Sequence, residues 1–408
     1  MSAEGGHVMR LHVRRVPICV PGFSFAGVAS GMKPSGRRDV ALLASEAPAA
    51  VAAAFTRNRV VAAPVTVARE HVRRGRARAI LVNSGMANAC TGPAGLDTVR
   101  AACAEAGRVL GADPRAILPC ATGRIGVQVP RRRLLEGVRA ACRALSPRSF
   151  WAAAEAITTT DAFLKAGVRR LDLGGRRVTV AAMAKGAGMI NPDMATMLVF
   201  ALTDARIGAG PLGAALRAAL AASFNAITVD GDTSTNDSAI ALANGVAGNE
   251  SLQTGSYAHR RFTATLTGLL AEVARLVVLD GEGATRCIEI VVRGARSAGD
   301  AARVARAIGT SMLAKAAFHG GDPNWGRVLC AAGYAGVPFE PQRCRIWIGK
   351  VLVVRGGVGC GNESRAARVM RRREFQLTVD LGLGRGSARL LTSDLSPAYV
   401  RFNSAYST

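Results

Sequence analysis

The sequence predicts a mixed α/β fold with a large main domain followed by a smaller α+β module. The first observation is composition: 49% of the 408 residues are hydrophobic, 5% are aromatic and 46 are glycine, which indicates a tightly packed core of Ala, Val and Leu. The second is pattern, since short apolar runs alternate with alanine-rich amphipathic segments, as strands and helices do in α/β proteins. The third is length, because 408 residues suffice for two or three domains.

The elements of the main domain, residues 16–284, follow from its apolar runs and turn residues. Asp97 is a predicted N-cap for a helix that runs through Val109, and a second helix is predicted over residues 131–145. Three short apolar runs predict strands. These runs are residues 51–55, 79–83 and 178–183.

The second half of the main domain begins with an uninterrupted apolar run. Residues 197–202 predict a buried strand, because such runs are typical of strands covered on both faces. A helix is predicted near residues 211–223, with Pro211 in its first turn. Residues 230–237 are dense in turn-forming residues and predict a loop.

The C-terminal module, residues 285–408, has a different character, with strands grouped around one predicted helix at residues 299–314. At the other end of the chain, residues 1–15 are polar and basic, and they predict a loosely ordered arm. The module's predicted strands are residues 288–292, 345–348, 351–354 and 375–379.

The sequence carries no signal for export or for a membrane span. The longest uncharged N-terminal stretch, residues 16–32, is interrupted by Pro17, Pro21 and several glycines, so it is too broken for a spanning helix or a signal core. The cytoplasm is therefore the expected location, and no membrane partner is predicted.

Cysteine and histidine usage argues against disulfides and metals. No two of the nine cysteines form a Cys-x-x-Cys pair, and an odd number over a long chain indicates reduced, mostly buried thiols. The five histidines are too scattered to suggest a metal cluster, so no metal is predicted.

The net charge of +25 permits two interpretations. Arginine clusters at residues 73–78, 131–133 and 371–373 could contact a nucleic acid or another anionic surface. No aromatic residues interleave these clusters, and no nucleic-acid motif is present. Solvated surface arginines are the favoured interpretation, and no specific nucleic-acid partner is predicted.

The most informative segment for function is residues 185–198. A glycine-spaced loop starts at Lys185, passes Pro192 and reaches Thr196, where the apolar run begins. A threonine at the entry of a rigid strand is well placed to act as a nucleophile. On this segment alone, however, an ordinary β-branched strand residue is the simpler interpretation.

The segment resembles the self-cleavage segment of the ornithine acetyltransferase family, also called glutamate N-acetyltransferase. Further stretches resemble landmarks of that family in the same order, from about residue 21 to the C-terminus. The resemblance implies an α-β-β-α layered main domain with an added C-terminal module, and not a Rossmann fold. The resembling stretches are residues 26–33, 56–60, 83–89, 120–126, 159–161, 230–237, 280–285, 322–327, 399–400 and 403.

The resemblance implies that the chain cleaves itself between Ala195 and Thr196. A threonine hydroxyl is a weak nucleophile until a base takes its proton, and cleavage would turn the Thr196 nitrogen into an α-amine that can do so. By the same resemblance, the Thr122 hydroxyl and the Gly123 N–H form the oxyanion hole, although spacing alone would favour a simple glycine turn there.

The resemblance also implies a set of substrate ligands. Lys185 would pair with a carboxylate, Thr159 would offer a hydroxyl, and Glu282 would hold the side-chain ammonium of ornithine. The set is completed by Thr196, Asn403 and the terminal Thr408. Departures from the family pattern at Met86, Ala162, Leu164, Leu391 and Thr392 put substrate choice in question without removing a catalytic group.

The leading hypothesis is an acetyltransferase that moves acetyl from N2-acetylornithine to glutamate through an acetyl-threonine intermediate, in arginine biosynthesis. We expect ping-pong kinetics, no cofactor, and two fragments associated as α2β2; acetyl-CoA is a possible second donor. A hydrolytic amidase or aminopeptidase, or an acyltransferase of specialised metabolism, could use the same threonine. A basic binding protein without catalysis is a third class, supported by charge alone.

Overall fold

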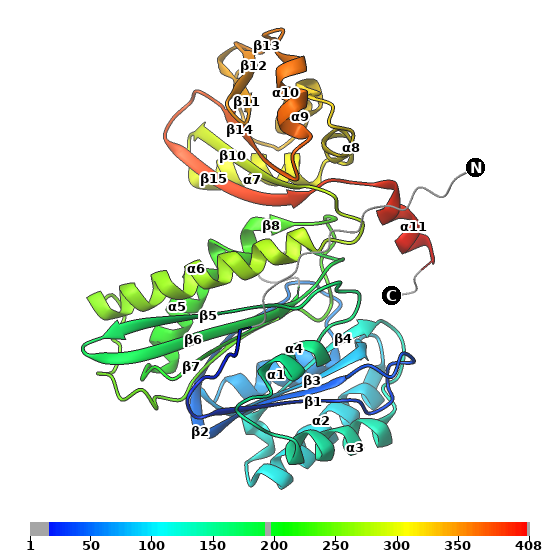
Figure 1. The fold of residues 1–408 in the computed structure, drawn as a ribbon, viewed down its shortest axis with the longest axis vertical. Helices are drawn as coiled ribbons and strands as arrows, with labels where there is room; N and C mark the ends of the chain where they lie inside the picture. The colour runs from blue at the N-terminus through cyan, green and yellow to red at the C-terminus, as the bar shows by residue number, and fades with distance from the viewer. Residues whose placement is uncertain (1–15, 192–196, 406–408) are drawn as a thin grey trace.

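The computed structural model describes residues 16–191 and 197–405 of the chain. Its larger sheet has eight described strands in the order β4-β3-β2-β9-β7-β6-β5, with β1 paired to β2 (Figure 1). The strands are β1 Phe23–Val28, β2 Val40–Phe55, β3 Arg76–Met86, β4 Ile117–Arg124, β5 Lys165–Leu173, β6 Arg176–Lys185, β7 Leu198–Thr203 and β9 Ser238–Ala243.

The long strand β2 divides this sheet into two halves. Its first part pairs with β1 and β3, its last part pairs with β9, and the register shifts between Ala44 and Ala49. One buried core contains side chains from both halves, among them Phe25 and Ile80 from one half and Phe200 and Ile240 from the other. The two halves therefore face each other across a shared inner core.

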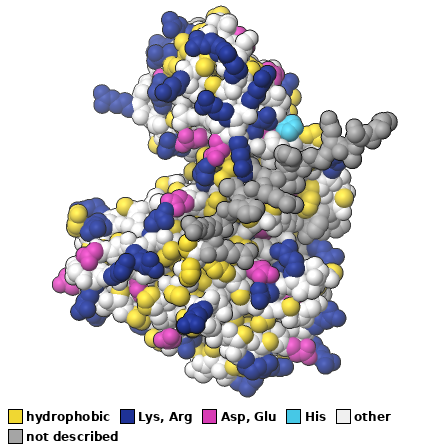
Figure 2. Space-filling view, viewed as in Figure 1, with side chains coloured by type: hydrophobic (Ala, Val, Ile, Leu, Met, Phe, Trp, Pro, Cys, Tyr) yellow, Lys and Arg dark blue, Asp and Glu magenta, His cyan; other side chains and the backbone are white. Residues whose placement is uncertain are grey.

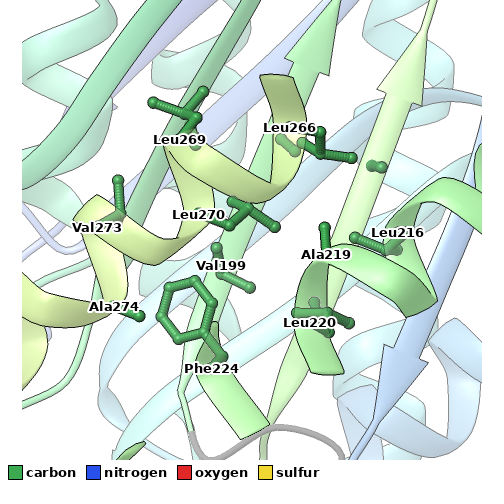
Figure 3. Close-up of a cluster of buried hydrophobic side chains, with 14 of the residues drawn as sticks. Val199, Leu216, Ala219, Leu220, Phe224, Leu266, Leu269, Leu270, Val273 and Ala274 are labelled. Atoms are coloured by element: carbon green, nitrogen blue, oxygen red, sulfur yellow. The ribbon is translucent and has the colours of Figure 1, made fainter. Parts of the chain in front are cut away.

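Helices cover the outer face of each half. Helices α5 (Ala209–Ala221) and α6 (Tyr257–Leu279) share a core with β5, β6, β7 and β9; Figure 3 shows Val199 of β7 among Leu216, Leu220 and Leu270 of these helices. The opposite face is covered by α1 (Ala63–Val72), α2 (Gly92–Leu110) and α3 (Arg131–Arg143), while α4 (Phe150–Ala156) packs into the inner core. The predicted α-β-β-α layering is confirmed.

Helix α6 is, among the described helices, the one that is long and apolar enough to cross a membrane. In this fold it is a core helix, because Phe262, Leu266, Leu270 and Val277 are fully buried in the core that it shares with α5 and the sheet. Burial against protein accounts for its apolar composition.

The second sheet has seven strands in the described part of the chain, in the order β13-β12-β11-β14-β10-β15-β8. Helices α7 (Ala298–Thr310), α8 (Met312–Gly320), α9 (Trp325–Gly333) and α10 (Glu363–Met370) share one core with it. The strands are β8 Ile227–Thr228, β10 Cys287–Ala295, β11 Arg345–Ile348, β12 Val351–Arg355, β13 Val358–Gly359, β14 Glu374–Asp380 and β15 Gly386–Ser393. Strand β8 precedes residue 285 in the chain and yet pairs with β15 in this second sheet. The domain boundary expected between residues 284 and 285 stays a prediction.

Two helix predictions were wrong in their bounds. The helix predicted to begin at Asp97 begins at Gly92, where a proline occupies the first turn, as helix starts favour. The helix predicted over residues 299–314 is two helices, separated at Ser311. The backbone of Ser311 is extended, and its side chain accepts the N–H of Ala314 as the N-cap of α8.

The other predicted elements lie close to observed ones. The strand predicted at residues 197–202 is β7, the helix predicted near 211–223 is α5, and the helix predicted at 131–145 is α3. Each predicted strand of the C-terminal module lies within or coincides with an observed strand: β10, β11, β12 and β14. Residues 230–237 form an irregular loop, as predicted.

The arginine clusters lie at the surface, apart from Arg78, which is half-buried. The side chains of Arg131, Arg132 and Arg133 are exposed, and so are those of Arg371, Arg372 and Arg373. Figure 2 shows Lys and Arg side chains spread over the visible face of both parts of the molecule, the one built on the larger sheet and the one built on the second sheet. This distribution is the one expected of solvated arginines. Of the nine cysteines, all free, five are buried, so the prediction of mostly buried thiols holds.

Candidate active site

A cavity of about 320 Å³ gathers residues from distant parts of the chain. Every predicted site residue that the structure describes lines it: Thr122, Gly123, Thr159, Lys185, Glu282 and Asn403. Met197, the residue after Thr196, also lines it. Three predicted residues, Ala195, Thr196 and Thr408, lie outside the described residues.

The oxyanion candidates are fixed by the pairing of β4 with β3. Thr122 lies opposite Ser84 and Gly123 lies opposite Gly85. Gly123 has a φ of +128°, and a Cβ there would lie 2.2 Å from the carbonyl carbon of Gly85. Only glycine fits this position, because a side chain would overlap the neighbouring strand.

Lys185 is the last residue of β6 and is paired with Leu198 at the start of β7. It is buried, and its Nζ donates a hydrogen bond to Thr122 Oγ1 at 3.0 Å. Burial lowers the pKa of Lys185, while the carboxylates of Asp161 and Glu282 oppose this shift. A carboxylate ligand in the cavity would supply the close negative charge that this lysine needs.

A buried ionic network lies behind the cavity wall. Lys165 Nζ donates to Asp161 Oδ1 and to Asp280 Oδ2, both at 2.5 Å. Asp161 also accepts the backbone N–H groups of Thr159, at 3.0 Å, and Gly186, at 2.8 Å. One carboxylate therefore fixes the backbone beside two predicted substrate ligands, Thr159 and Lys185.

Charges within this network keep it ionised despite burial. Although burial alone would raise the pKa of Asp161, Lys165 and Lys185 hold it well below its usual range. Burial likewise opposes the charge of Lys165, but its two carboxylate partners raise its pKa. Asp280 differs, because burial outweighs Lys165 and raises the pKa of this carboxyl to about 6.

The loop before residues 192–196 is clamped by Asp230. This carboxylate accepts the backbone N–H groups of Met189 at 2.5 Å and Ile190 at 2.8 Å. Met189 has a φ of +56°, a conformation that few non-glycine residues adopt. The hydrogen bonds to Asp230 thus stabilise a strained backbone at the approach to the predicted cleavage site.

Glu282 occupies the part of the cavity formed by the chain's last described helix. Its Oε2 accepts a hydrogen bond from Asn403 Nδ2 at 3.1 Å, and Asn403 belongs to α11 (Pro397–Ala405). A Cβ on Gly188 would lie 2.3 Å from the same oxygen, so glycine lets the loop pass the carboxylate. Burial raises the pKa of Glu282, while hydrogen bonds from Thr160 and Asn403 oppose the shift.

Several lining residues received no role from the sequence. Asp230, Asn236, Asp237 and Tyr399 line the cavity, and Lys165 supports it from behind. The first three lie in the loop at residues 230–237, whose density of polar residues was visible but indicated only a turn. Among the described residues, no group of three or more His, Cys, Asp or Glu side chains could hold a metal ion.

Comparison with known proteins identifies the family. A model of the ArgJ family matches residues 24–408. A protein of Geobacter sulfurreducens named arginine biosynthesis bifunctional protein ArgJ is 47% identical over 391 residues, which are 95% of this chain and 100% of that protein. A protein of the same name from Symbiobacterium thermophilum is 47% identical over 390 residues, covering 95% of this chain and 97% of its own length.

Solved structures of similar sequence cover shorter stretches. An arginine biosynthesis bifunctional protein ArgJ from Bacillus halodurans is 38% identical, with a TM-score of 0.48, over 50% of this chain and 96% of that one. An ornithine acetyltransferase from Mycobacterium tuberculosis, complexed with ornithine, is 38% identical, with a TM-score of 0.39, over 43% of this chain and 93% of that one. With a family model matched from residue 24 to its end and relatives 47% identical along 95% of its residues, the chain belongs to the ArgJ family.

Proposed function

We propose that this protein is an acetyltransferase of arginine biosynthesis that transfers acetyl from N2-acetylornithine to glutamate. Family membership supports the pathway, because the relatives at 47% identity are named for arginine biosynthesis. The observation that carries the proposal is the single cavity that contains Thr122, Gly123, Lys185 and Glu282. In this cavity Thr122 and Gly123 can donate hydrogen bonds to an oxyanion, Lys185 is a cation, and Glu282 is a carboxylic acid.

The charges of the cavity suit an α-amino acid substrate. Lys185 pairs with the α-carboxylate, and Glu282, held by Asn403, accepts the side-chain ammonium of ornithine. Thr159 contributes its hydroxyl, and Thr408 completes the ligand set at the chain terminus. Glutamate binds through the same α-carboxylate contact after ornithine leaves.

The proposed nucleophile is Thr196, freed by cleavage of the Ala195–Thr196 bond. Its α-amine takes the hydroxyl proton as the oxygen attacks the acetyl carbon, and Thr122 and Gly123 donate hydrogen bonds to the oxyanion. The Thr196 ammonium gives its proton to the departing nitrogen as the amide bond breaks, so ornithine leaves and the acetyl group stays on Thr196 as an ester. The amine of glutamate then attacks this ester and takes up the acetyl group, and Thr196 regains its hydroxyl. Ping-pong kinetics follow from this order.

The sheet supports a stable complex of the two fragments. Strands β7 and β9, which follow the cut, pair with each other and lie between β2 and β6, which precede it. Fragments 1–195 and 196–408 therefore share a continuous sheet and one inner core, so cleavage leaves them associated. Two such pairs form the proposed α2β2 assembly.

The first prediction concerns processing of the chain. Thr196→Ala should yield one uncut 42.3 kDa chain without transfer activity, whereas Thr196→Ser should retain some cleavage and some activity. The reason is that the hydroxyl serves both cleavage and catalysis. Intact mass and N-terminal sequencing of the wild-type protein are the measurements, and a fully active uncut chain would contradict the mechanism.

A donor and acceptor assay defines the reaction. Ornithine release from N2-acetylornithine should depend on glutamate, since the acetyl group leaves Thr196 only on an amine. Release at full rate without glutamate would instead indicate hydrolysis. Replacing N2-acetylornithine by acetyl-CoA in the same assay determines whether the second donor is accepted.

A further inference from the structure

The proposed reaction brings two amino acids with opposite side-chain charges into one cavity. Ornithine carries an ammonium group on its Cδ atom, whereas Cδ of glutamate is the carbon of a carboxylate. The charged atoms are therefore bonded to the same carbon and lie equally far along the side chain. Since Lys185 holds the α-carboxylate of both substrates, their oppositely charged ends reach the same part of the cavity.

The described lining of this cavity is poor in positive charge. It contains one basic side chain, Lys185, and four acidic ones, Asp230, Asp232, Asp237 and Glu282. Both oxygens of Asp230 accept backbone N–H groups, and the buried Asp237 has one oxygen, Oδ2, without a hydrogen-bond partner among the described residues. With Lys185 bound to the α-carboxylate, the described lining offers no second cation for the side-chain carboxylate of glutamate.

Glu282 is firmly held at the end of the cavity that the proposed function assigns to the ornithine ammonium. Its backbone N–H donates to the carbonyl oxygen of Ala187 at 2.8 Å, and its Oε2 accepts from Asn403 Nδ2 at 3.1 Å. The loop at Gly188 passes so close that a Cβ there would lie 2.3 Å from Oε2 and 2.7 Å from Oε1. These contacts leave the carboxyl group little room to turn away from a like charge.

The polar partners of Glu282 can serve either charge. The hydroxyl of Thr160 and the amide of Asn403 both hydrogen-bond to its carboxyl group, and each of these groups can donate or accept. The carboxyl group itself must change, because two carboxylates that meet at one site repel each other and bind a proton between them.

We propose, resting on the function proposed above, that Glu282 accommodates both substrates by changing its protonation state. As a carboxylate it accepts hydrogen bonds from the side-chain ammonium of ornithine or N2-acetylornithine. As a carboxylic acid it donates its proton in a hydrogen bond to the side-chain carboxylate of glutamate. The enzyme takes up one proton from solvent when glutamate replaces ornithine, and it releases that proton when N-acetylglutamate leaves and N2-acetylornithine binds.

The charges around Glu282 favour this uptake and release. Burial raises the pKa of Glu282, the charge of Asp230 adds to the increase, and Lys185 at the end of β6 opposes it together with the two hydrogen bonds. Tyr399 faces Glu282 from α11, and burial raises the pKa of its phenol, which therefore stays neutral. An ammonium group beside a carboxyl group lowers its pKa by roughly 1–3, whereas a second carboxylate raises it.

Two exchange reactions test the proposal, because each involves only one kind of amino acid. Acetyl transfer from N2-acetylornithine to labelled ornithine reports the ammonium substrate, and transfer from N-acetylglutamate to labelled glutamate reports the carboxylate substrate. Both need a free α-amine on the acceptor and the contact to Lys185, so these requirements cancel in the ratio of the two rates. Below saturation, the ratio of ornithine exchange to glutamate exchange should rise at least ~tenfold between about pH 5.5 and 8.

Glu282→Gln is the decisive variant, because its amide stays neutral and can still donate to a carboxylate. We expect ornithine exchange to fall at least ~tenfold through loss of a charged hydrogen bond, and glutamate exchange to fall less than about threefold. The ratio of the two rates should become independent of pH. Glu272→Gln is the matched control: Glu272 on α6 is exposed, pairs with Arg169 and does not line the cavity, so this variant should keep the wild-type ratio.

The outcomes separate this proposal from the proposed function. A wild-type protein that catalyses neither exchange counts against the function itself. Two exchanges whose ratio does not change with pH overturn the role of Glu282, and so does an equal loss of both exchanges in a folded Glu282→Gln protein. Thermal unfolding of the variant verifies that it is folded.

Discussion

At the scale of single residues, the site depends on a few positions where the side chain is fixed by its neighbours. Lys185 is buried with one hydroxyl partner, Thr122, and with carboxylates nearby. Gly123 carries no side chain, but no other residue type fits at this position, because the backbone of β3 passes directly beside it. Both positions tolerate little change, for different physical reasons.

Gly123→Ala should destabilise the protein by about 2–3 kcal/mol and abolish transfer, because its Cβ would overlap the backbone of Gly85 and displace Thr122. Gly126→Ala is the matched control: Gly126 also has a positive φ, +78°, but a Cβ there meets nothing within 4 Å. The control should lose only about 1 kcal/mol. Urea unfolding and the transfer assay measure both, and equal losses would contradict the steric explanation.

At the scale of elements, the buried network of Lys165, Asp161 and Asp280 joins three segments of the site. It connects the start of β5, the loop at Thr159 and the end of α6, two residues before Glu282. Each segment carries or adjoins a predicted substrate ligand. The network therefore links the stability of the main domain to the geometry of substrate binding.

Lys165→Met should cost about 3–5 kcal/mol of unfolding free energy, because it leaves two buried carboxylates without their cation. Any folded fraction should show a raised KM, since Asp161 no longer holds Thr159 and Gly186 as firmly. Lys315→Met is the control, because buried Lys315 donates to neutral partners, Thr392 and Ser393. A loss in Lys165→Met no larger than in the control would contradict this account.

The pH dependence of stability should reveal Asp280. Its folded-state pKa of about 6 exceeds the unfolded value of about 3.9, so the folded chain holds this proton more tightly. Its contribution is therefore complete below about pH 4 and is lost as pH rises through about 6, a change of about 3 kcal/mol. Asp280→Asn, which cannot titrate, should show a flatter dependence in urea midpoints between pH 4 and 7.

At the scale of the whole molecule, both parts of the chain build one cavity. Residues before the predicted cut supply Thr122, Thr159 and Lys185, while residues after it supply Glu282 and Asn403. The C-terminal helix α11 contributes to the cavity although none of its residues is buried. The helix is thus positioned for the site and adds little to the core.

Removing residues 397–408 should leave the fold intact but impair binding. The deletion takes Tyr399 and Asn403 from the cavity and leaves Glu282 without the hydrogen bond from Asn403, so KM for N2-acetylornithine should rise roughly tenfold, as expected when a charged ligand group loses a hydrogen-bond donor. Thermal unfolding should shift little. Arg401→Ala, an exposed change on the same helix, is the control, and an unchanged KM in the truncated protein would contradict the assigned contact.

The sequence by itself determined the element types, the layered fold class and the family. Apolar runs such as residues 178–183 and 197–202 lie in strands, because the local period of hydrophobic residues decides between strand and helix. Six of the residues that line the cavity were also proposed as site residues from sequence motifs, whereas Asp230, Asn236, Asp237 and Tyr399 were not. Helix bounds failed at Gly92 and Ser311, where capping decided the outcome.

Only the tertiary structure decided which side chains meet. Lys165 and Asp280 are 115 residues apart in the chain, and no local pattern pairs them. The fold of the sheet at β2, the entry of β8 into the second sheet and the unpartnered oxygen of Asp237 were equally invisible in sequence. The physical reason is that local periodicity fixes which face of an element is buried, whereas partners across a core depend on packing of the whole chain.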